Sequence, residues 1–477
     1  MSIKNTELFS NLAILVKRTL PLIGEQLEAA FYVHPFKEYP EISYENDNFP
    51  SVRTYTMKAD ISVFFQRKNS NFTPKIDLEV DDLFIAITKA LTEWPEYRAY
   101  FNDNVTDQPV FLQIHAENFI KDIIIGYYYQ FGLNYDSENL LVIYTPLENF
   151  ILAKELKFDL AVPILFTRFD CDSFFLTENI LIRKIDEATQ KAKFSIRTFS
   201  PAIVDPVIYS ATHELVLMNY KSKKQASYYE YGTFAEPKIY PHDLIEKFFS
   251  ILKLATNITS GYSQVIVHPH NWASRTKYDI KYLTGTSLRS YPTYFDDFYW
   301  TSKNFPKVSG NDLSLIARLF ADVINSRENK LEIALKRFYK SMMRQEEEDI
   351  IIDIIIALEI LLSDNEKSEL THKLALRITT LIAAESEESA DPLITFANIK
   401  KIYDYRSAVV HGSHKANQKR EIKLPDNKVI PVISLANDYL RHILMILIPN
   451  PKYLSAKEID NMMLLNQHKN KTTGKKQ

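Results

Sequence analysis

The stretch PLITFANIKKIYDYRSAVVHGS, residues 392–413, carries the clearest structural and chemical signals in the chain. Proline at its first position and Gly412 near its end mark the limits of one long helix, predicted over 392–411. Polar side chains gather in the last turns of this helix, between Tyr403 and Ser407, and His411 stands at its end. A helix that ends in such a cluster is a candidate for a functional site.

Helical periodicity continues on both sides of this stretch. Helices are predicted at 312–326, 328–343, 346–363, 367–385, 392–411 and 431–448. Short connections between helices of this length predict an all-α antiparallel bundle over 311–449. We expect the bundle to follow Ser309-Gly310, with Asp312 as the N-cap of its first helix. Residues 450–477 are predicted to form a short helix through Leu465 and then a basic, disordered tail.

Residues 1–310 have a different pattern. Short runs of β-branched and aromatic residues between positions 140 and 219 predict strands. These runs are LLVIY, AVPILFTRF, SFFLT, NILIRKI and ELVLMNY. Helices are predicted near 12–31, with a break at Pro21, near 80–92 and over 242–256. The predicted fold class is therefore α+β, in which a strand-rich mixed region of one or two subdomains, with a sensory or regulatory role, precedes the helical bundle.

Composition limits the class of protein. Hydrophobic residues make up 46% of the 477 residues and charged residues 25%, as in globular proteins. The formal net charge of −3 argues against a uniformly basic nucleic-acid-binding surface but permits a local basic patch. The single cysteine, Cys171, is typical of the cytosol. The N-terminus lacks a signal-peptide layout, and the densest apolar run, 350–362, is shorter than the roughly 20 residues of a membrane span, so we expect a cytoplasmic protein without a membrane partner.

Glycine is scarce, and its spacing excludes two kinds of nucleotide site. The chain has nine glycines, and the closest pair, Gly126 and Gly132, is six residues apart. Neither the G-x-G-x-x-G pattern of dinucleotide sites nor the G-x-x-x-x-G-K-[ST] pattern of P-loops fits this spacing. The sequence predicts no cofactor and no metal site.

Arg406 and His411 are the predicted catalytic residues. Arginine binds phosphate through a planar fork of N–H donors and stabilises negative charge, and histidine passes protons near neutral pH. The two residues are five positions apart, about 140° around an ideal helix, so they do not share one face. A common site therefore needs the reach of the arginine, a distorted last turn or a second chain.

The segment SHKANQKREIK, residues 413–423, follows the helix and is rich in basic residues. Lysine and arginine bind nucleic acids mainly through the phosphate backbone. We therefore predict that this loop binds RNA through His414, Lys415, Lys419 and Arg420.

Residues from about 312 to 448 resemble the Apea-like branch of the HEPN superfamily. The matching segments are EEEDIIIDIIIALEILL, THKLALRIT and KKIYDYRSAVVHGS. Members carry an R-x4–6-H motif with a polar residue directly after the arginine, which Arg406, Ser407 and His411 match. The resemblance implies a metal-independent endoribonuclease, in which the RNA 2′-hydroxyl attacks its adjacent phosphate and leaves 2′,3′-cyclic phosphate and 5′-hydroxyl ends.

The same resemblance implies a homodimer, in which the motifs of two copies face one cleft. By this resemblance Arg406 stabilises the phosphorane-like transition state, and His411 acts as general base, general acid or phosphate ligand. It also implies a toxin-like effector of anti-phage defence that acts on RNA, with transfer RNA as the first candidate. The trigger that residues 1–310 would sense is not identified by the sequence.

Five further residues are predicted to support this site: Ser407, Glu359, Arg377, Tyr403 and Asp404. Glu359 and Arg377 lie on apolar faces of successive helices, and a buried carboxylate needs a partner, so we predict an ion pair between them. The functional alternative is that one or both line the RNA cleft beside Arg406. Tyr403 and Asp404 are candidates for the same cleft, and Ser407 either orients Arg406 or faces solvent.

Two other classes of function fit the sequence. One is a non-catalytic HEPN module that binds RNA or nucleotide and scaffolds a partner, although the intact R-x4-H motif argues against it. The other is a metal-dependent hydrolase within residues 1–310, where Asp170 and Asp172 share a face of a predicted strand but lack a third ligand. Cleavage of RNA in the presence of EDTA discriminates between these functions.

Overall fold

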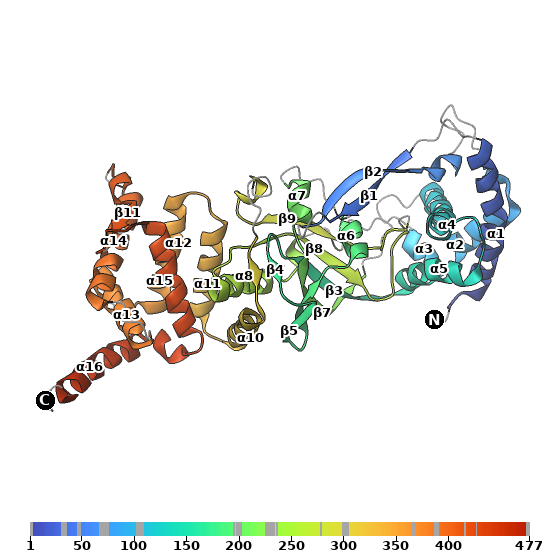
Figure 1. Cartoon of the computed structure of the whole chain (residues 1–477). Coiled ribbons are helices and arrows are strands. Elements are labelled where there is room, and N and C mark those ends of the chain that lie inside the picture. Colours follow the sequence, from blue (N-terminus) through green and yellow to red (C-terminus); the bar gives the residue numbers. More distant parts are fainter. Residues whose placement is uncertain are drawn as a thin grey trace. The chain divides into compact units, whose positions relative to one another are not determined.

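A computed structural model of the chain places most of its residues. The described residues are 3–29, 36–44, 49–65, 76–101, 109–193, 196, 203–224, 234, 237–276, 279–297, 305–364, 369–385, 391–414, 416–425 and 427–473. They form a mixed α/β structure with two compact units (Figure 1). The first unit comprises Met1–Leu165, Asn179–Tyr240 and Ser263–Arg289, and the second comprises Phe166–Glu178, Pro241–Tyr262 and Ser290–Gln477.

Helices dominate the beginning of the first unit. They are α1 (Thr6–Ala29), η1 (Ile61–Phe65), η2 (Leu78–Val80), α2 (Asp82–Glu93), α3 (Pro95–Phe101), α4 (Pro109–Phe131) and α5 (Ser137–Leu152). The helices predicted near 12–31 and 80–92 are confirmed as α1 and α2. The predicted break at Pro21 is wrong, because α1 continues through this residue, which lies on its exposed side.

The prediction of a strand-rich region is wrong for the first 152 residues. Their described strands are β1 (Phe36–Ser43) and β2 (Ser51–Ala59), which pair antiparallel. The run LLVIY lies in α5, where the Asp136 side chain caps the helix start by accepting the Glu138 N–H at 2.8 Å. Consecutive apolar residues are compatible with a buried helix as well as with a strand, so the run alone was ambiguous.

The largest sheet follows these helices and has the strand order β5-β6-β7-β3-β8-β9. Its strands are β3 (Glu155–Pro163), β5 (Ser173–Thr177), β6 (Ile180–Lys184), β7 (His213–Lys223), β8 (Tyr262–Pro269) and β9 (Thr284–Ser290). The runs SFFLT, NILIRKI and ELVLMNY coincide with β5, β6 and β7, which confirms these strand predictions. The run AVPILFTRF is divided between the end of β3 and the two-residue strand β4 (Arg168–Phe169).

One apolar cluster of the first unit lies on one face of this sheet. Strand β3 pairs antiparallel with β7 and β8, and Ala161 lies opposite Val216 on one side and Ile266 on the other. These three side chains are buried together with Ala192 of α6 (Glu187–Lys193). Helix α6 ends at Lys193, which is fully buried. The short helices α7 (Asp205–Tyr209) and η5 (Pro237–Ile239) complete this unit.

The second unit is mainly helical. Its helices are α8 (His242–Thr256), α10 (Gly310–Asn325), α11 (Asn329–Met343), α12 (Glu347–Leu362), α13 (Leu370–Glu385), α14 (Pro392–Val410), η6 (Asn417–Lys419), α15 (Val432–Leu447), η7 (Pro451–Leu454) and α16 (Ala456–Thr473). Its described strands are β4, β5, β10 (Lys307–Val308), β11 (Glu421–Lys423) and β12 (Val429–Pro431). The helices predicted between 312 and 448 and over 242–256 are confirmed, with bounds that agree within about three residues.

Helices α12, α13, α14 and α15 pack against one another and place the predicted site (Figure 1). Helix α12 is anchored on α11 through Asp353, a carboxylate that is only 1% exposed. Asp353 accepts hydrogen bonds from Arg337 at 2.7 Å and from Arg344 at 3.2 Å. A buried carboxylate with two arginine donors fixes the helix that carries Glu359.

The ends of the bundle differ from the predictions. Ser309, rather than Asp312, is the N-cap of α10, and the two residues form a capping box in which Asp312 stands at N3. Helix α16 continues to Thr473, beyond the predicted end at Leu465, so residues 466–473 of the predicted disordered tail are helical. In the part of the chain that the structure describes, no helix combines the length and apolar character needed to cross a membrane.

Candidate active site at the end of α14

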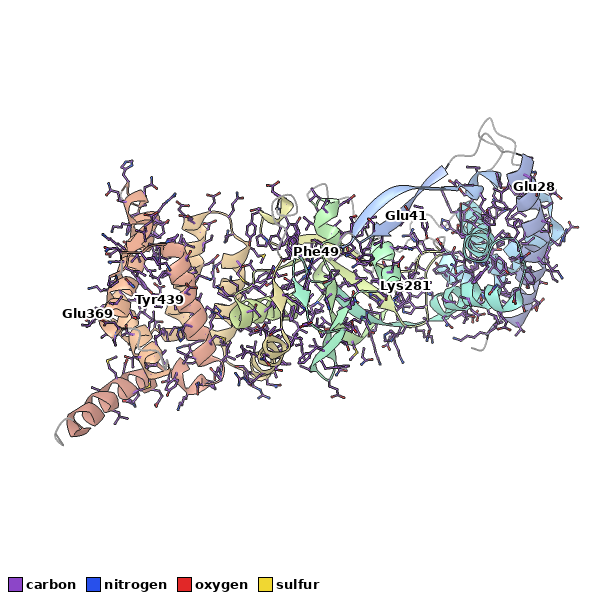
Figure 2. The ribbon with its side chains drawn as sticks, viewed as in Figure 1. Glu28, Glu41, Phe49, Lys281, Glu369 and Tyr439 are labelled. Atoms are coloured by element: carbon purple, nitrogen blue, oxygen red, sulfur yellow. The ribbon has the colours of Figure 1, made fainter. Side chains whose placement is uncertain are left out.

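Helix α14 carries both predicted catalytic residues, and contacts along its length hold it in the bundle. At its start, the Asp391 side chain accepts the backbone N–H of Leu393 at 2.8 Å. Further along, Asn398 Nδ2 donates to the hydroxyl of Tyr439 in α15 at 3.5 Å, and Figure 2 labels Tyr439 on that helix. Helices α12, α13 and α15 cover its apolar side. The bundle thus fixes the backbone from which Arg406 and His411 project.

Helix α14 ends in a Schellman motif directly at His411. The Gly412 N–H donates to the Val409 carbonyl at 3.0 Å, and the Ser413 N–H donates to the Ala408 carbonyl at 2.9 Å. Gly412 has φ +60°, a left-handed conformation that glycine adopts without strain. His411 is therefore the C-cap, and its side chain is exposed. An exposed imidazole at a fixed helix end is accessible to a substrate.

Arg406 lies one turn earlier and is half-buried. Its Nε atom is enclosed, and no acceptor lies within hydrogen-bonding distance of it among the described residues. A buried donor without an acceptor costs about 1–3 kcal/mol. Arginine side chains offer five N–H donors in a planar fork, so an anion that reaches this position would gain charge-assisted hydrogen bonds.

Glu359 of α12 and Tyr403 of α14 lie close to Arg406. Burial raises the pKa of the Glu359 carboxyl, and the positive charge of Arg406 opposes this shift. The Tyr403 hydroxyl also lowers the pKa of Glu359, although it has no hydrogen-bond partner of normal geometry among the described residues. Burial and the Glu359 charge in turn raise the pKa of Tyr403, so its hydroxyl keeps its proton. Two supporting residues predicted from the sequence are thus placed beside the arginine.

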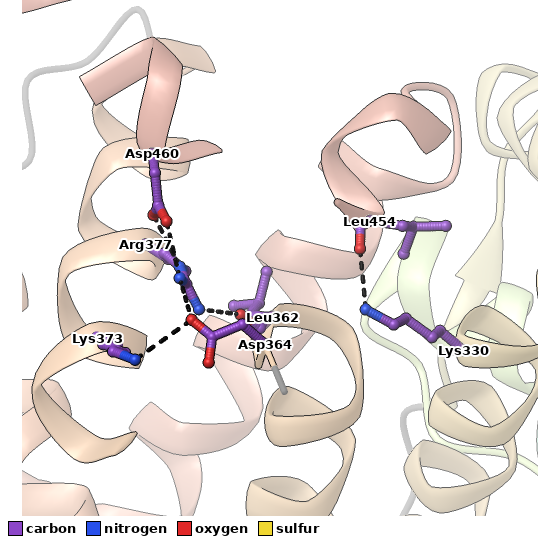
Figure 3. Close-up of polar contacts among 7 residues, drawn as sticks. All are labelled: Lys330, Leu362, Asp364, Lys373, Arg377, Leu454 and Asp460. Carbon is purple, nitrogen blue, oxygen red and sulfur yellow. Dashed lines mark hydrogen bonds and ion pairs between the residues drawn. The ribbon is translucent and has the colours of Figure 1, made fainter. Parts of the chain in front are cut away.

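The predicted ion pair between Glu359 and Arg377 is wrong. Arg377 is 3% exposed, and Nε and one terminal nitrogen donate to Asp460 of α16 at 2.9 and 2.8 Å. It also donates to Asp364 at 2.7 Å and to the carbonyl of Leu362 at 2.9 Å (Figure 3). Arg377 therefore fastens α16 and the end of α12 to α13, and its side chain is occupied. The alternative that it lines an RNA cleft loses support for the same reason.

The basic loop after α14 is partly engaged within the chain. Arg420 lies 2.9 Å from Glu348 and 3.6 Å from Glu347, at the start of α12. Lys419 Nζ donates to the carbonyl of Asp404 at 3.4 Å. Two of the four predicted RNA-binding residues must therefore exchange protein partners for phosphates before they bind RNA.

The remaining predicted residues lie at the surface. Ser407, Asp404 and His414 are exposed. Lys415 lies outside the described residues. In one copy of the chain the imidazole of His411 is exposed, whereas the guanidinium of Arg406 turns inward toward Glu359. This difference agrees with their separation of about 140° around the helix.

Sequence analysis missed the residues that hold Arg377. Asp364 lies directly after the helix predicted over 346–363. Asp460 is 83 positions from Arg377, and no local pattern connects the two residues.

Among the described residues, no group of three or more histidine, cysteine, aspartate or glutamate side chains is arranged to hold a metal ion.

Comparison with known proteins gives no relative for this chain. No protein-family model matches it, and neither the curated proteins nor the solved structures contain a match.

Proposed function

We propose that this chain is a metal-independent endoribonuclease of the HEPN type, acting as a toxin-like effector in anti-phage defence. The observation that carries the proposal is the guanidinium of Arg406, whose enclosed Nε–H has no acceptor among the described residues. The exposed imidazole of His411 at the end of the same helix supplies a proton-transfer group. A phosphate ligand and a proton-transfer group are what internal cleavage of RNA requires.

In the proposed reaction the 2′-oxygen of the RNA attacks its adjacent phosphorus, and the bond from phosphorus to the 5′-oxygen breaks. The 2′-hydroxyl gives its proton to a base, and the departing 5′-oxygen receives a proton. Arg406 stabilises the extra negative charge of the phosphorane-like transition state. His411 serves as the base or the acid, or it orients the phosphate. The products carry 2′,3′-cyclic phosphate and 5′-hydroxyl ends.

A homodimer is part of the proposal. In one copy Arg406 turns inward while His411 is exposed, so one chain does not present both groups on the same face of α14. Pairing two α14 helices lets the arginine of one copy act with the histidine of the other. We place the reaction in the cytoplasm with transfer RNA as the first substrate to test, and we assign the sensing of an unidentified trigger to the first unit.

Expression in growing cells tests the toxin proposal. Overexpressed wild-type protein is expected to arrest growth and fragment cellular RNA even without the trigger, whereas Arg406→Ala and His411→Ala should each abolish both effects. The matched control is His442→Ala, which removes an exposed histidine of α15 to which no catalytic or RNA-binding role is assigned. Retained toxicity in both active-site variants, at equal protein levels, would refute the assignment. Wild-type protein that binds RNA without cleaving it would indicate the non-catalytic module instead.

A further inference from the structure

The hydroxyl of Tyr403 is the second enclosed polar group at this site without a partner. Tyr403 is 6% exposed, and its oxygen has no hydrogen-bond partner among the described residues. It precedes Arg406 by three positions, and residues at this spacing are neighbours on one face of a helix. The protein therefore places two donors that lack a hydrogen bond of normal geometry, Tyr403 O–H and Arg406 Nε–H, side by side on α14. Glu359 is the group that interacts with the Tyr403 hydroxyl.

Glu359 faces both donors from α12. Arg406 and Tyr403 are the groups that act on its carboxyl, and among the described residues no charged group of α11, α13 or α15 acts on it. Even so, no Glu359–Arg406 ion pair within 4.0 Å is formed among the described residues, so the two charges are near each other but separated. An acceptor with several oxygens, placed among the three groups, would satisfy both donors.

We propose that Arg406, Tyr403 and Glu359 form one phosphate-binding site, in which a proton on Glu359 accompanies the bound phosphate. Arg406 Nε–H and Tyr403 O–H donate to non-bridging phosphate oxygens. The protonated Glu359 carboxyl donates a third hydrogen bond, whereas the ionised carboxylate repels the phosphate. The proposal rests on the ribonuclease function above only in naming RNA as the source of the phosphate, because free phosphate has the same chemistry.

The proton on Glu359 follows from the electrostatics of the site. Burial already raises the pKa of this carboxyl, and Arg406 restrains the rise. A bound phosphate neutralises Arg406 and adds negative charge, so it raises the pKa of Glu359 further. Binding therefore takes up a proton, and affinity falls as the pH rises through the raised pKa of Glu359.

The test measures binding rather than cleavage. The full-length chain is titrated with RNA that carries 2′-O-methyl groups throughout, which cannot react through its 2′-oxygens, from about pH 5 to about pH 8 at constant ionic strength. The affinity of the wild type should fall by about tenfold over this range, as loss of one hydrogen bond to a charged group predicts. Glu359→Gln should bind independently of pH and more tightly than the wild type near pH 8, because its amide keeps a donor and carries no charge.

Tyr403→Phe should weaken binding by about tenfold at every pH, because it removes one donor to the phosphate. Tyr405→Phe is the matched control, since the Tyr405 hydroxyl is also enclosed on α14 without a hydrogen bond of normal geometry. It interacts with Glu347, Glu348 and Arg420 rather than with Glu359. Glu328→Gln, an exposed residue at the N-cap of α11, controls for the loss of one negative charge. Thermal unfolding of each variant establishes that it is folded.

Two outcomes overturn the proposal. One is wild-type affinity that does not change with pH, and the other is Tyr403→Phe that binds like Tyr405→Phe. If the ribonuclease assays succeed while either outcome is found, only the phosphate site is wrong. If the wild type binds the methylated RNA with the expected dependence on pH and on Tyr403 but never cleaves unmodified RNA, the proposed phosphate site is supported and the proposed ribonuclease function is wrong. Inorganic phosphate alone is titrated in the same way. If its binding depends on pH and on Tyr403 as expected and that of the RNA does not, the ligand of the site is free phosphate.

Discussion

The guanidinium of Arg377 donates to both carboxylate oxygens of Asp460, at 2.9 and 2.8 Å, and so joins α13 to the C-terminal helix α16. The Asp460 hydrogen bonds, followed by those to Asp364, raise the pKa of Arg377 above its usual range. Because the arginine is buried and fully engaged, we assign it to the stability of the bundle. The site at Arg406 and the contact at Arg377 are therefore expected to respond differently to mutation.

Arg377→Ala should lower the free energy of unfolding of the second unit by about 1–3 kcal/mol, because it removes the donor to the Leu362 carbonyl and to Asp460 and one of two cations beside Asp364. Asp460→Asn should cost less, since Asp460 is about half-exposed. Urea denaturation followed by circular dichroism measures both changes. At temperatures where the Arg377 variant is folded, its RNA cleavage rate should equal that of the wild type. A cleavage defect as large as that of Arg406→Ala would contradict this assignment and indicate that Arg377 acts in the active site.

The burial of Lys193 predicts an unusual pH dependence of the stability of the first unit. Its ammonium donates to Gln190 at 2.9 Å and lies 5.3 Å from the centre of the Tyr209 ring. Burial lowers the pKa of Lys193 from 10.5 to about 7, and Glu214 opposes this shift. Between these two pH values the unfolded chain holds a proton that the native state lacks, so stability rises with pH across this window.

Lys193→Met should therefore stabilise the first unit at pH 7 and below, by at most about 5 kcal/mol. The gain should shrink as the pH approaches 10.5, where lysine is neutral in both states. Hydrogen exchange of β6 and β7 during urea titration, at about pH 6 and about pH 10, measures the difference. Lys191→Met, on the same helix and in an ion pair with Glu187, is the control. An equal effect at both pH values would contradict the burial of a neutralised lysine.

The ion pairs of Arg420 predict how its mutation changes the salt dependence of RNA binding. If RNA phosphate replaces Glu347 and Glu348 as its partner, Arg420→Ala should reduce the slope of log affinity against log salt concentration by about 1. Replacing both glutamates by glutamine should free Arg420 and strengthen RNA binding at low salt. The control with the same change in charge is the pair Glu328→Gln and Glu332→Gln. An unchanged salt slope in Arg420→Ala would remove this residue from the RNA-binding surface.

The packing of α8 predicts which fragments of the chain fold on their own. It packs on α10, α11 and α15, where Phe248 meets Phe320 with ring centres 6.3 Å apart and Arg441 donates to the Leu254 carbonyl at 2.7 Å. A fragment of residues 311–477 lacks α8 and is expected to lose cooperative unfolding and to aggregate, because these apolar side chains are exposed. Phe248→Ala in the full chain should destabilise the second unit by about 3–5 kcal/mol. A fragment that unfolds cooperatively would contradict this account.

The C-terminal helices could be predicted from the sequence because their signals are local. Pro392 and Gly412 mark the limits of α14, and the structure confirms the left-handed residue after His411. The run LLVIY was misassigned because consecutive apolar residues do not distinguish a buried helix from a strand. The packing of α5 within the first unit decides that this run is helical, and the hydrophobic periodicity of the sequence carries no information about that packing.

The site could be predicted only in part. The sequence identified Arg406, Glu359 and Tyr403, but it paired Glu359 with Arg377 because both lie on apolar faces of successive helices. The structure pairs Arg377 with Asp460, 83 positions away, and places Glu359 near Arg406 instead. Which of two possible cations a buried carboxylate meets depends on how the helices pack, and this information is not local.

The most direct test of the central claim compares wild-type and His411→Ala proteins, purified identically, on total cellular RNA in EDTA, with chemical mapping of the cut ends. We predict discrete cuts with 2′,3′-cyclic phosphate and 5′-hydroxyl ends that the variant does not make, since loss of such a group lowers the rate by about 10²–10⁴. Equal cleavage by both proteins, or ends that carry a 5′-phosphate, would contradict the account.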